Sequence, residues 1–189
     1  ELRSSIVFSA GMNQRLYTYI TQFADFFPNE QGDIRKKICL KVSDFRSAEI
    51  QGRFLAKRGL WVSEYRIESG LNCGGHAFPT TGLLIGPVLE EFKQRRQELT
   101  EKLFTMCNKV LAEKGRIVMK DYPEVRVTIQ GGIGTFDEDE LLRDYYNVDG
   151  TGWGTPFLLV PEVTNVDEVH IKKLTESTEQ DIFLSDSSP

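Results

Sequence analysis

The sequence has few cysteines and no dense cluster of basic residues. Its three cysteines, Cys39, Cys73 and Cys107, are an odd number that forms no disulfide framework, which favours reduced thiols in a cytoplasmic protein. There are 23 Lys and Arg residues against 28 Asp and Glu residues, so the formal net charge is −5. Because phosphate backbones are bound by clustered Lys and Arg, we expect no nucleic-acid partner.

Long hydrophobic runs are also missing, and no signal peptide opens the sequence. No apolar run is long enough to cross a bilayer, so we expect no membrane partner. The 189 residues are 40% hydrophobic and 27% charged, a composition that excludes wholesale disorder and fits one packed domain. The sequence starts without Met and almost at once enters an apolar segment, and we interpret residues 1–189 as a single partial domain of a longer protein.

Short apolar runs and amphipathic stretches alternate along the chain. Apolar runs bounded by turn residues indicate strands, and apolar residues spaced three and four apart indicate helices. Strands are expected over 5–9, 37–42, 60–67, 126–130 and 148–152. Helices are expected over 13–26, 44–57, 84–114, from the acidic run 137–140 onward, and over 165–176. This alternation predicts parallel strands joined by helical crossovers, either in a (β/α)8 barrel or in an open doubly wound sheet.

The sequence also predicts the buried face of the first helix and the ends of the second. In the first helix, the spacing of Leu16, Tyr19, Ile20 and Phe23 predicts the buried face. In the second helix, Ser43 or Asp44 can cap the amino end and Gly59 can end the helix.

Two glycine-rich segments follow neighbouring predicted strands. Parallel folds place their functional loops after the carboxyl ends of strands, and glycine lets backbone amides come close to an anion. We therefore expect the two loops to share one phosphate group. A tight turn explains the first loop equally well, and packing explains the tryptophan of the second loop equally well. The candidate ligand-binding residues are Gly131, Gly132, Ile133 and Gly134 in the first loop, and Gly152, Trp153, Gly154 and Thr155 in the second.

A third glycine-rich loop carries the candidate catalytic residue, His76, directly after two glycines. An accessible imidazole can move a proton near neutral pH. Cys73 and His76 supply only two metal ligands, so no metal site is expected. Lys41, near the carboxyl end of another predicted strand, is the lysine best placed to form a Schiff base if the chemistry is not redox.

At these loops the sequence resembles the nitronate monooxygenase family of FMN-binding TIM barrels, whose fold is shared by flavin-dependent enoyl-acyl-carrier-protein reductases. The family pattern ends one strand in Gln-Gly, followed by acid-Ala-Gly-Gly-His. It continues with Gly-Gly-Ile and a small residue after the next strand, and with Gly-Thr-x-Phe after the last. The corresponding segments are Glu68-Ser69-Gly70, Asn72-Cys73-Gly74-Gly75-His76, Gly131-Gly132-Ile133-Gly134 and Gly154-Thr155-Pro156-Phe157. Asn72-Cys73 departs from the family's acid-Ala, and residues 116–124 correspond to an insertion.

The resemblance implies an α/β fold in which residues 1–189 form the carboxyl-terminal portion, strands four to eight, of a (β/α)8 barrel. It implies FMN as cofactor, a small-molecule substrate, and an oxidoreductase in which His76 handles a proton. It also implies a partner, because the first three units must come from a missing amino-terminal half or be replaced by self-association. The alternatives are an enoyl reductase-like enzyme, a non-redox aldolase or isomerase that binds a phosphorylated ligand, and a non-catalytic fragment.

Overall fold

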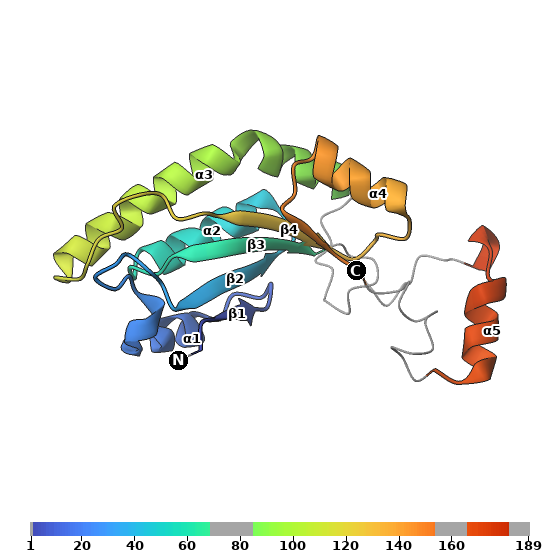
Figure 1. Ribbon diagram of the computed structural model, residues 1–189, viewed down its shortest axis with the longest axis horizontal. Coiled ribbons are helices and arrows are strands. Elements are labelled where there is room, and N and C mark those ends of the chain that lie inside the picture. The colour runs from blue at the N-terminus through green and yellow to red at the C-terminus, as the bar shows by residue number, and fades with distance from the viewer. Residues whose placement is uncertain (1, 69–84, 154–165, 182–189) are drawn as a thin grey trace.

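The chain forms a parallel β-sheet whose strands alternate with helices. The computed structural model describes residues 2–68, 85–153 and 166–181 (Figure 1). The strands run in the order β1-β2-β3-β4-β5, and each pairs in parallel with its neighbour in the sequence. Their bounds are Ser4–Phe8 for β1, Lys36–Val42 for β2, Val62–Glu68 for β3, Arg126–Gln130 for β4 and Gly150–Gly152 for β5.

Helices α1 to α4 occupy the connections between these strands and α5 follows β5, and Figure 1 shows α2, α3 and α4 over the same face of the sheet. This follows from the strand order, because right-handed crossovers between consecutive strands put every helix on one side. The described strands show no reversal of order of the kind that defines a doubly wound sheet. The helices are α1 Gln14–Tyr19, α2 Phe45–Ala56, α3 Ile85–Glu113, α4 Phe136–Glu140 and α5 Glu168–Glu176. Shorter helical turns follow at Ile20–Gln22, Ala24–Phe26, Leu141–Tyr145 and Glu179–Asp181.

The hydrophobic core lies between the sheet and these helices. Alternate side chains of a strand point to opposite faces, so each central strand contributes one apolar set to the helices. These core residues, all buried, are Leu40 and Val42 of β2, Tyr65 and Ile67 of β3, and Val127 and Ile129 of β4. Above them, the rings of Phe45 on α2 and Phe92 on α3 meet edge to face with centroids 5.2 Å apart. This apolar layer accounts for the docking of α2 and α3.

The opposite face of the sheet is polar. The strand registers place one set of alternate side chains side by side across four strands. We call this set the polar face. It consists of Lys37, Cys39 and Lys41 of β2, Glu64, Arg66 and Glu68 of β3, Arg126, Thr128 and Gln130 of β4, and Gly150 and Gly152 of β5.

Most predicted elements are confirmed, with boundaries that shift by a few residues. Asp44 caps α2 through a 2.6 Å hydrogen bond from the Ser47 amide, and the chain leaves this helix at Gly59 with a φ of 78°. Among the described residues, no helix combines the length and hydrophobicity needed to cross a bilayer.

The helix expected over 13–26 is shorter, and of its predicted buried face only Ile20 is buried. After α1 the chain continues in two short turns, and Leu16, Tyr19 and Phe23 are exposed. Tyr17 enters the core beside Ile20, and its ring lies 5.1 Å from that of Phe8 while its hydroxyl donates to Gln51 Oε1 at 2.8 Å. Tyr17 and Ile20 therefore define the side of this segment that faces inward.

Candidate functional site

At the carboxyl edge of the sheet, the loop after β4 lies beside the end of β5. The Gly131 amide donates to the Gly152 carbonyl at 3.0 Å, so the end of β5 contacts the loop that follows β4. Of the predicted ligand-binding residues, Gly131 to Gly134, Gly152 and Trp153 are described. His76, Gly154 and Thr155 lie outside the described residues.

The loop after β4 turns through two left-handed glycines. Gly131 has a φ of 82° and Gly132 a φ of 71°, a conformation that side chains rarely tolerate. Ile133 then anchors the loop, because its side chain is buried in the core. Among the described residues, the amides of Gly132 and Ile133 have no acceptor.

The next two amides of this loop already hold an anionic group. Glu138 Oε2 accepts from the Gly134 amide at 2.8 Å and from the Thr135 amide at 2.9 Å. The Thr135 hydroxyl accepts in return from the Glu138 amide at 3.3 Å, which completes a capping box at α4. The Gly134 and Thr135 amides hold the pKa of the Glu138 carboxyl below its ordinary value. A phosphate that used Gly134 would compete with this carboxylate, which sequence reasoning had assigned to a helix start alone.

The Trp153 side chain serves packing rather than ligand contact. Its ring is partly buried against the hydrophobic core, and its Nε1 donates to the Thr151 hydroxyl at 3.3 Å. Of the two interpretations of this residue, the structure therefore shows packing for the ring and leaves the main-chain amide for a ligand.

A polar triad that the sequence analysis did not assemble lies at the carboxyl end of the polar face. Glu68 Oε1 is 2.6 Å from Lys41 Nζ and accepts from Gln130 Nε2 at 2.8 Å. The Glu68 side chain is only 8% exposed and that of Lys41 is 22% exposed. The triad is formed by β2, β3 and β4, near the points where these strands end. The Lys41 ammonium is thus the partner of the Glu68 carboxylate at this edge of the sheet.

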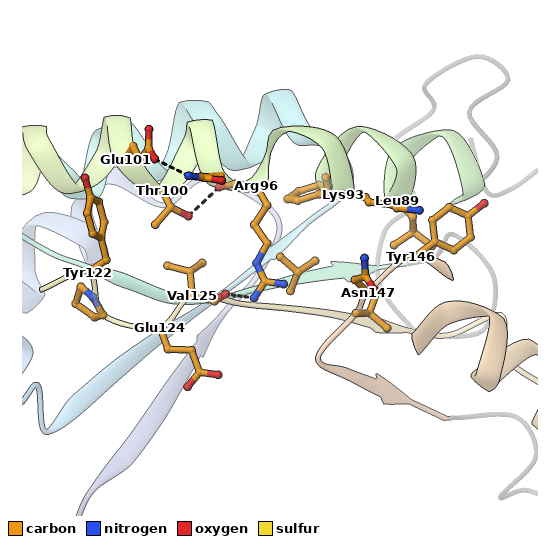
Figure 2. Close-up of a pocket in the computed structure, with 15 residues that line it drawn as sticks. Leu89, Lys93, Arg96, Thr100, Glu101, Tyr122, Glu124, Val125, Tyr146 and Asn147 are labelled. Carbon is orange, nitrogen blue, oxygen red and sulfur yellow. Dashed lines mark hydrogen bonds between the residues drawn. The ribbon is translucent and has the colours of Figure 1, made fainter. Parts of the chain in front are cut away.

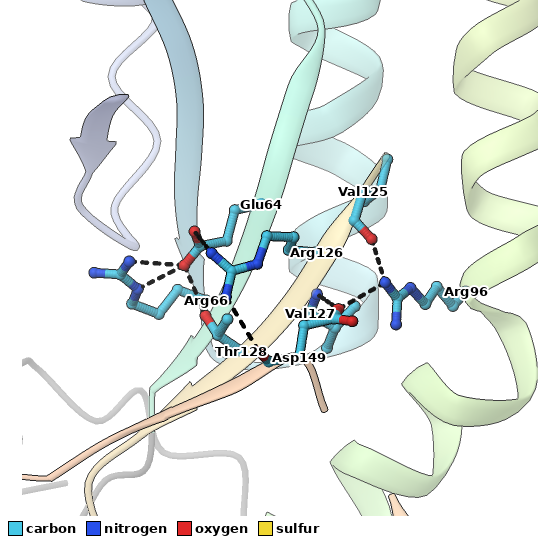
Figure 3. A network of polar contacts seen from close by, with 8 residues as sticks. All are labelled: Glu64, Arg66, Arg96, Val125, Arg126, Val127, Thr128 and Asp149. Carbon is cyan, nitrogen blue, oxygen red and sulfur yellow. Dashed lines mark hydrogen bonds and ion pairs between the residues drawn. The ribbon is translucent and has the colours of Figure 1, made fainter. Parts of the chain in front are cut away.

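A second polar cluster lies on the same face, one layer further from the loops (Figure 3). Glu64 Oε1 accepts from Arg66 Nη2 at 2.7 Å, from Arg66 Nε at 2.9 Å and from the Thr128 hydroxyl at 2.7 Å. Arg126 Nη1 is 4.0 Å from Glu64 Oε2. Burial opposes the charge on Glu64, but the hydrogen bonds from Thr128 and Arg66 outweigh it and hold the pKa of the carboxyl below its ordinary value.

The glycines of β5 make room for these polar side chains. A Cβ atom at Gly152 would lie 2.9 Å from Gln130 Cβ, and one at Gly150 would lie 3.2 Å from Arg126 Nη2. The side chains of β4 thus lean over a strand that has none of its own on this face. Gly152 therefore has a packing role in addition to the carbonyl that it offers to the first loop.

The described Cys and His residues add no reactive group to this site. Cys39 lies on the polar face, where burial and the neighbouring Glu64 charge raise the pKa of its thiol to about 12. Burial raises the pKa of the Cys107 thiol, also to about 12. Both are small buried side chains, as expected from the sequence. His170 lies on the exposed helix α5, with Nδ1 2.5 Å from Asp167 Oδ2.

A groove of about 590 Å³ lies on the other side of the sheet, between α3 and the amino end of β4 (Figure 2). Leu89, Val125 and Val127 contribute apolar surface to it. Arg96 crosses the groove, but its guanidinium is held by the Val125 carbonyl and by Asp149 Oδ2 at 2.6 Å. This groove has volume without convergent reactive groups, so the carboxyl edge of the polar face remains the better candidate.

No family model, curated protein or solved structure matches this chain. The functional interpretation therefore depends on the geometry of the site and on the motifs of the sequence.

Proposed function

We propose that this chain forms the flavin-binding portion of an FMN-dependent oxidoreductase that resembles the nitronate monooxygenases. The observation that supports this most is the 3.0 Å contact between the Gly131 amide and the Gly152 carbonyl, which joins the loop after β4 to the end of β5 at the carboxyl edge. In barrels, loops after neighbouring strands can share one phosphate, and the order of these loops is the order that the resemblance requires.

The fold supports a barrel as the setting of this site. Consecutive parallel strands with helices on one face form an arrangement that can curl and close. Within the described residues, β1 and β5 each pair on one edge only, and Ile6 and Val7 of β1 are 37% and 46% exposed. We infer that further strands, from an amino-terminal half or from a second copy, pair with these edges. The polar face would then line the barrel interior.

The loop residues fit the phosphate of FMN, except that Glu138 occupies the Gly134 amide. The amides of Gly132 and Ile133 would donate to the phosphate, together with those of Gly154 and Thr155, while the Gly134 amide would have to be released by Glu138. When bound, flavin supplies the electron or hydride chemistry. The chain's own residues bind and orient: Lys41 and Glu68 provide paired charges at the mouth of the polar face.

His76 is proposed to hold or move a proton near the substrate. This role comes from the family resemblance and from the chemistry of imidazole near neutral pH.

The affinities of the full chain for FMN and for riboflavin test the proposal. Both can be measured by quenching of flavin fluorescence. Riboflavin lacks only the phosphate, so it is a matched control for the cradle. Charge-assisted hydrogen bonds contribute about 1.5–3 kcal/mol, so we expect FMN to bind roughly 10- to 150-fold more tightly. Equal affinities for the two flavins, or no binding of either, would contradict the proposal.

Replacement of His76 separates catalysis from cofactor binding. We expect His76→Asn to reduce turnover of an alkyl nitronate by a factor of about 10² or more while flavin is retained. Equal loss of turnover and flavin would indicate that the imidazole is structural.

The enoyl-reductase alternative uses the same flavin residues and differs in the electron acceptor. Oxidation of bound reduced flavin by an enoyl thioester, with no reaction toward nitronates, would favour it. Borohydride trapping at Lys41 with a carbonyl substrate would favour the aldolase alternative.

A further inference from the structure

A compact hydrogen-bond network joins the two glycine-rich loops on the helical face of the sheet. Its centre is the Thr151 hydroxyl in β5, which donates to Asp139 Oδ1 at 2.5 Å. The same oxygen accepts from Arg143 Nη2 at 3.0 Å and from Trp153 Nε1 at 3.3 Å. Arg143 Nε also pairs with Asp139 Oδ2 at 2.8 Å, which closes the network.

The members of this network come from both sides of the proposed ligand site. Asp139 belongs to α4 and Arg143 to the turn that continues it, and this helix begins directly after the loop of Gly131 and Gly132. Thr151 and Trp153 flank Gly152, whose carbonyl accepts from the Gly131 amide. The network therefore holds α4 against β5 on one face, while the main-chain contact holds the loops together at the edge.

The charged groups of the network lie close together and have hydrogen-bond partners within it. The Asp139 side chain is 16% exposed, and hydrogen bonds from Thr151 and Arg143 hold the pKa of its carboxyl below the ordinary value. Thr151 has one hydroxyl hydrogen and two lone pairs, and the three contacts use all of them. A Ser at this position could repeat these contacts, whereas a Val of nearly the same shape could make none of them.

We propose that Thr151 is a positioning residue that, with Asp139 and Arg143, fixes the main chain at Gly152 and Trp153 so that both loops present their amides to one phosphate. The ligand part of this inference rests on the proposed function. The network does not touch the ligand: it lies on the helical side, and its effect passes through the backbone of β5.

The paired variants Thr151→Val and Thr151→Ser test this role. In the full chain, we expect Thr151→Val to lower the affinity for FMN about tenfold with little change for riboflavin, because only the phosphate contacts depend on the two loops. Thr151→Ser should restore the preference for FMN. A general loss of stability would instead weaken both flavins equally. Asp139→Asn, which keeps the side-chain size, should lower the preference in the same direction.

Hydrogen exchange of the Gly131 amide measures the stability of its hydrogen bond to the Gly152 carbonyl in the absence of ligand. We expect faster exchange in Thr151→Val than in wild type and in Thr151→Ser, with unchanged exchange in the core of β3. If wild type prefers FMN but Thr151→Val keeps both that preference and slow exchange at Gly131, the positioning role is overturned and the proposed function stands. If wild type shows no preference for FMN, the proposed function is overturned and the ligand-positioning role with it.

Discussion

Replacing Glu64 by Gln tests how much the polar face depends on a buried charge. The Glu64 side chain is 13% exposed, and one carboxylate oxygen accepts from Arg66 and Thr128. A Gln oxygen can keep part of these hydrogen bonds, and Arg66 is 31% exposed to solvent, which screens the ion pair. The loss is therefore smaller than for a fully buried pair. We expect a decrease of about 1–2 kcal/mol in the free energy of unfolding at pH 7.

The pKa of Glu64 determines how its contribution to stability changes with pH. Because the folded-state pKa of Glu64 lies below its ordinary value of 4.5, the charged form stabilises the fold above that pH. This stabilisation is lost as the pH falls from about 4.5 through the lower folded-state pKa. The Glu64→Gln variant has no such charge, so the difference between variant and wild type should shrink as the solution is acidified.

Urea unfolding at a series of pH values measures both effects. For a chain of this size, about 1–2 kcal/mol corresponds to a melting-temperature decrease of roughly 2–8 °C. Glu113→Gln is the matched control, because Glu113 is 60% exposed and its distance to Lys109 is 4.0 Å. That variant should change stability by less than about 0.5 kcal/mol. A Glu64→Gln deficit that stays constant from pH 7 to pH 3 would refute the argument.

Two further substitutions probe close contacts. Gly52→Ala places a Cβ 2.5 Å from the Tyr65 hydroxyl, so we expect a loss of about 1–3 kcal/mol in urea unfolding. The loss should be smaller in a Tyr65→Phe background, and an equal loss in both backgrounds would show that the hydroxyl is not the obstacle. Glu138→Gln removes the charge that competes for the Gly134 amide, so FMN binding should tighten about two- to fivefold while the weakened capping box costs about 0.5–1 kcal/mol of stability. Weaker FMN binding in this variant would show that Glu138 supports the ligand instead of competing with it.

The elements of the fold could be predicted because their signals are local. The range of α3, the Asp44 cap and the glycine at position 59 each follow from signals within a few residues, and the structure confirms them. The order of strands and helices also predicted the parallel pairing, since helical crossovers leave little choice of direction. The boundaries moved by one or two residues at most strands, and by two at the start of β5.

The missed contacts have two different causes. Tyr17 packs on Phe8 and donates a hydrogen bond to Gln51 Oε1, 34 residues away, and the periodicity of 13–26 contains neither partner. Glu138 reaches back only four residues to the Gly134 amide, so the glycine loop and the acidic run are one feature, although they were interpreted as two. This second contact had a local signal, because Thr135 followed by Glu138 three residues later is the pattern of a capping box.

The triad of Lys41, Glu68 and Gln130 shows the same limit at the candidate site. Each residue alone is an ordinary polar residue near the end of a strand, and only the register of β2, β3 and β4 brings them together. The alternation of polar and apolar residues in these strands did carry a signal, because it predicts one face for the core and one for something else. With the register of the strands known, the contact between Lys41, Glu68 and Gln130 could have been predicted.

The polar face contains largely buried carboxylates whose net contribution to stability is small. Glu68 and Glu64 are 8% and 13% exposed, so each has lost most of its hydration. Partners at 2.6–2.8 Å recover part of that cost, but well-packed apolar residues often stabilise a fold as much as a buried ion pair does. The helical face of the same strands is apolar and already accounts for folding. Two layers of paired charges lead to the place where the loop after β4 meets the end of β5, and we propose that a polar ligand binds there and is oriented by Lys41.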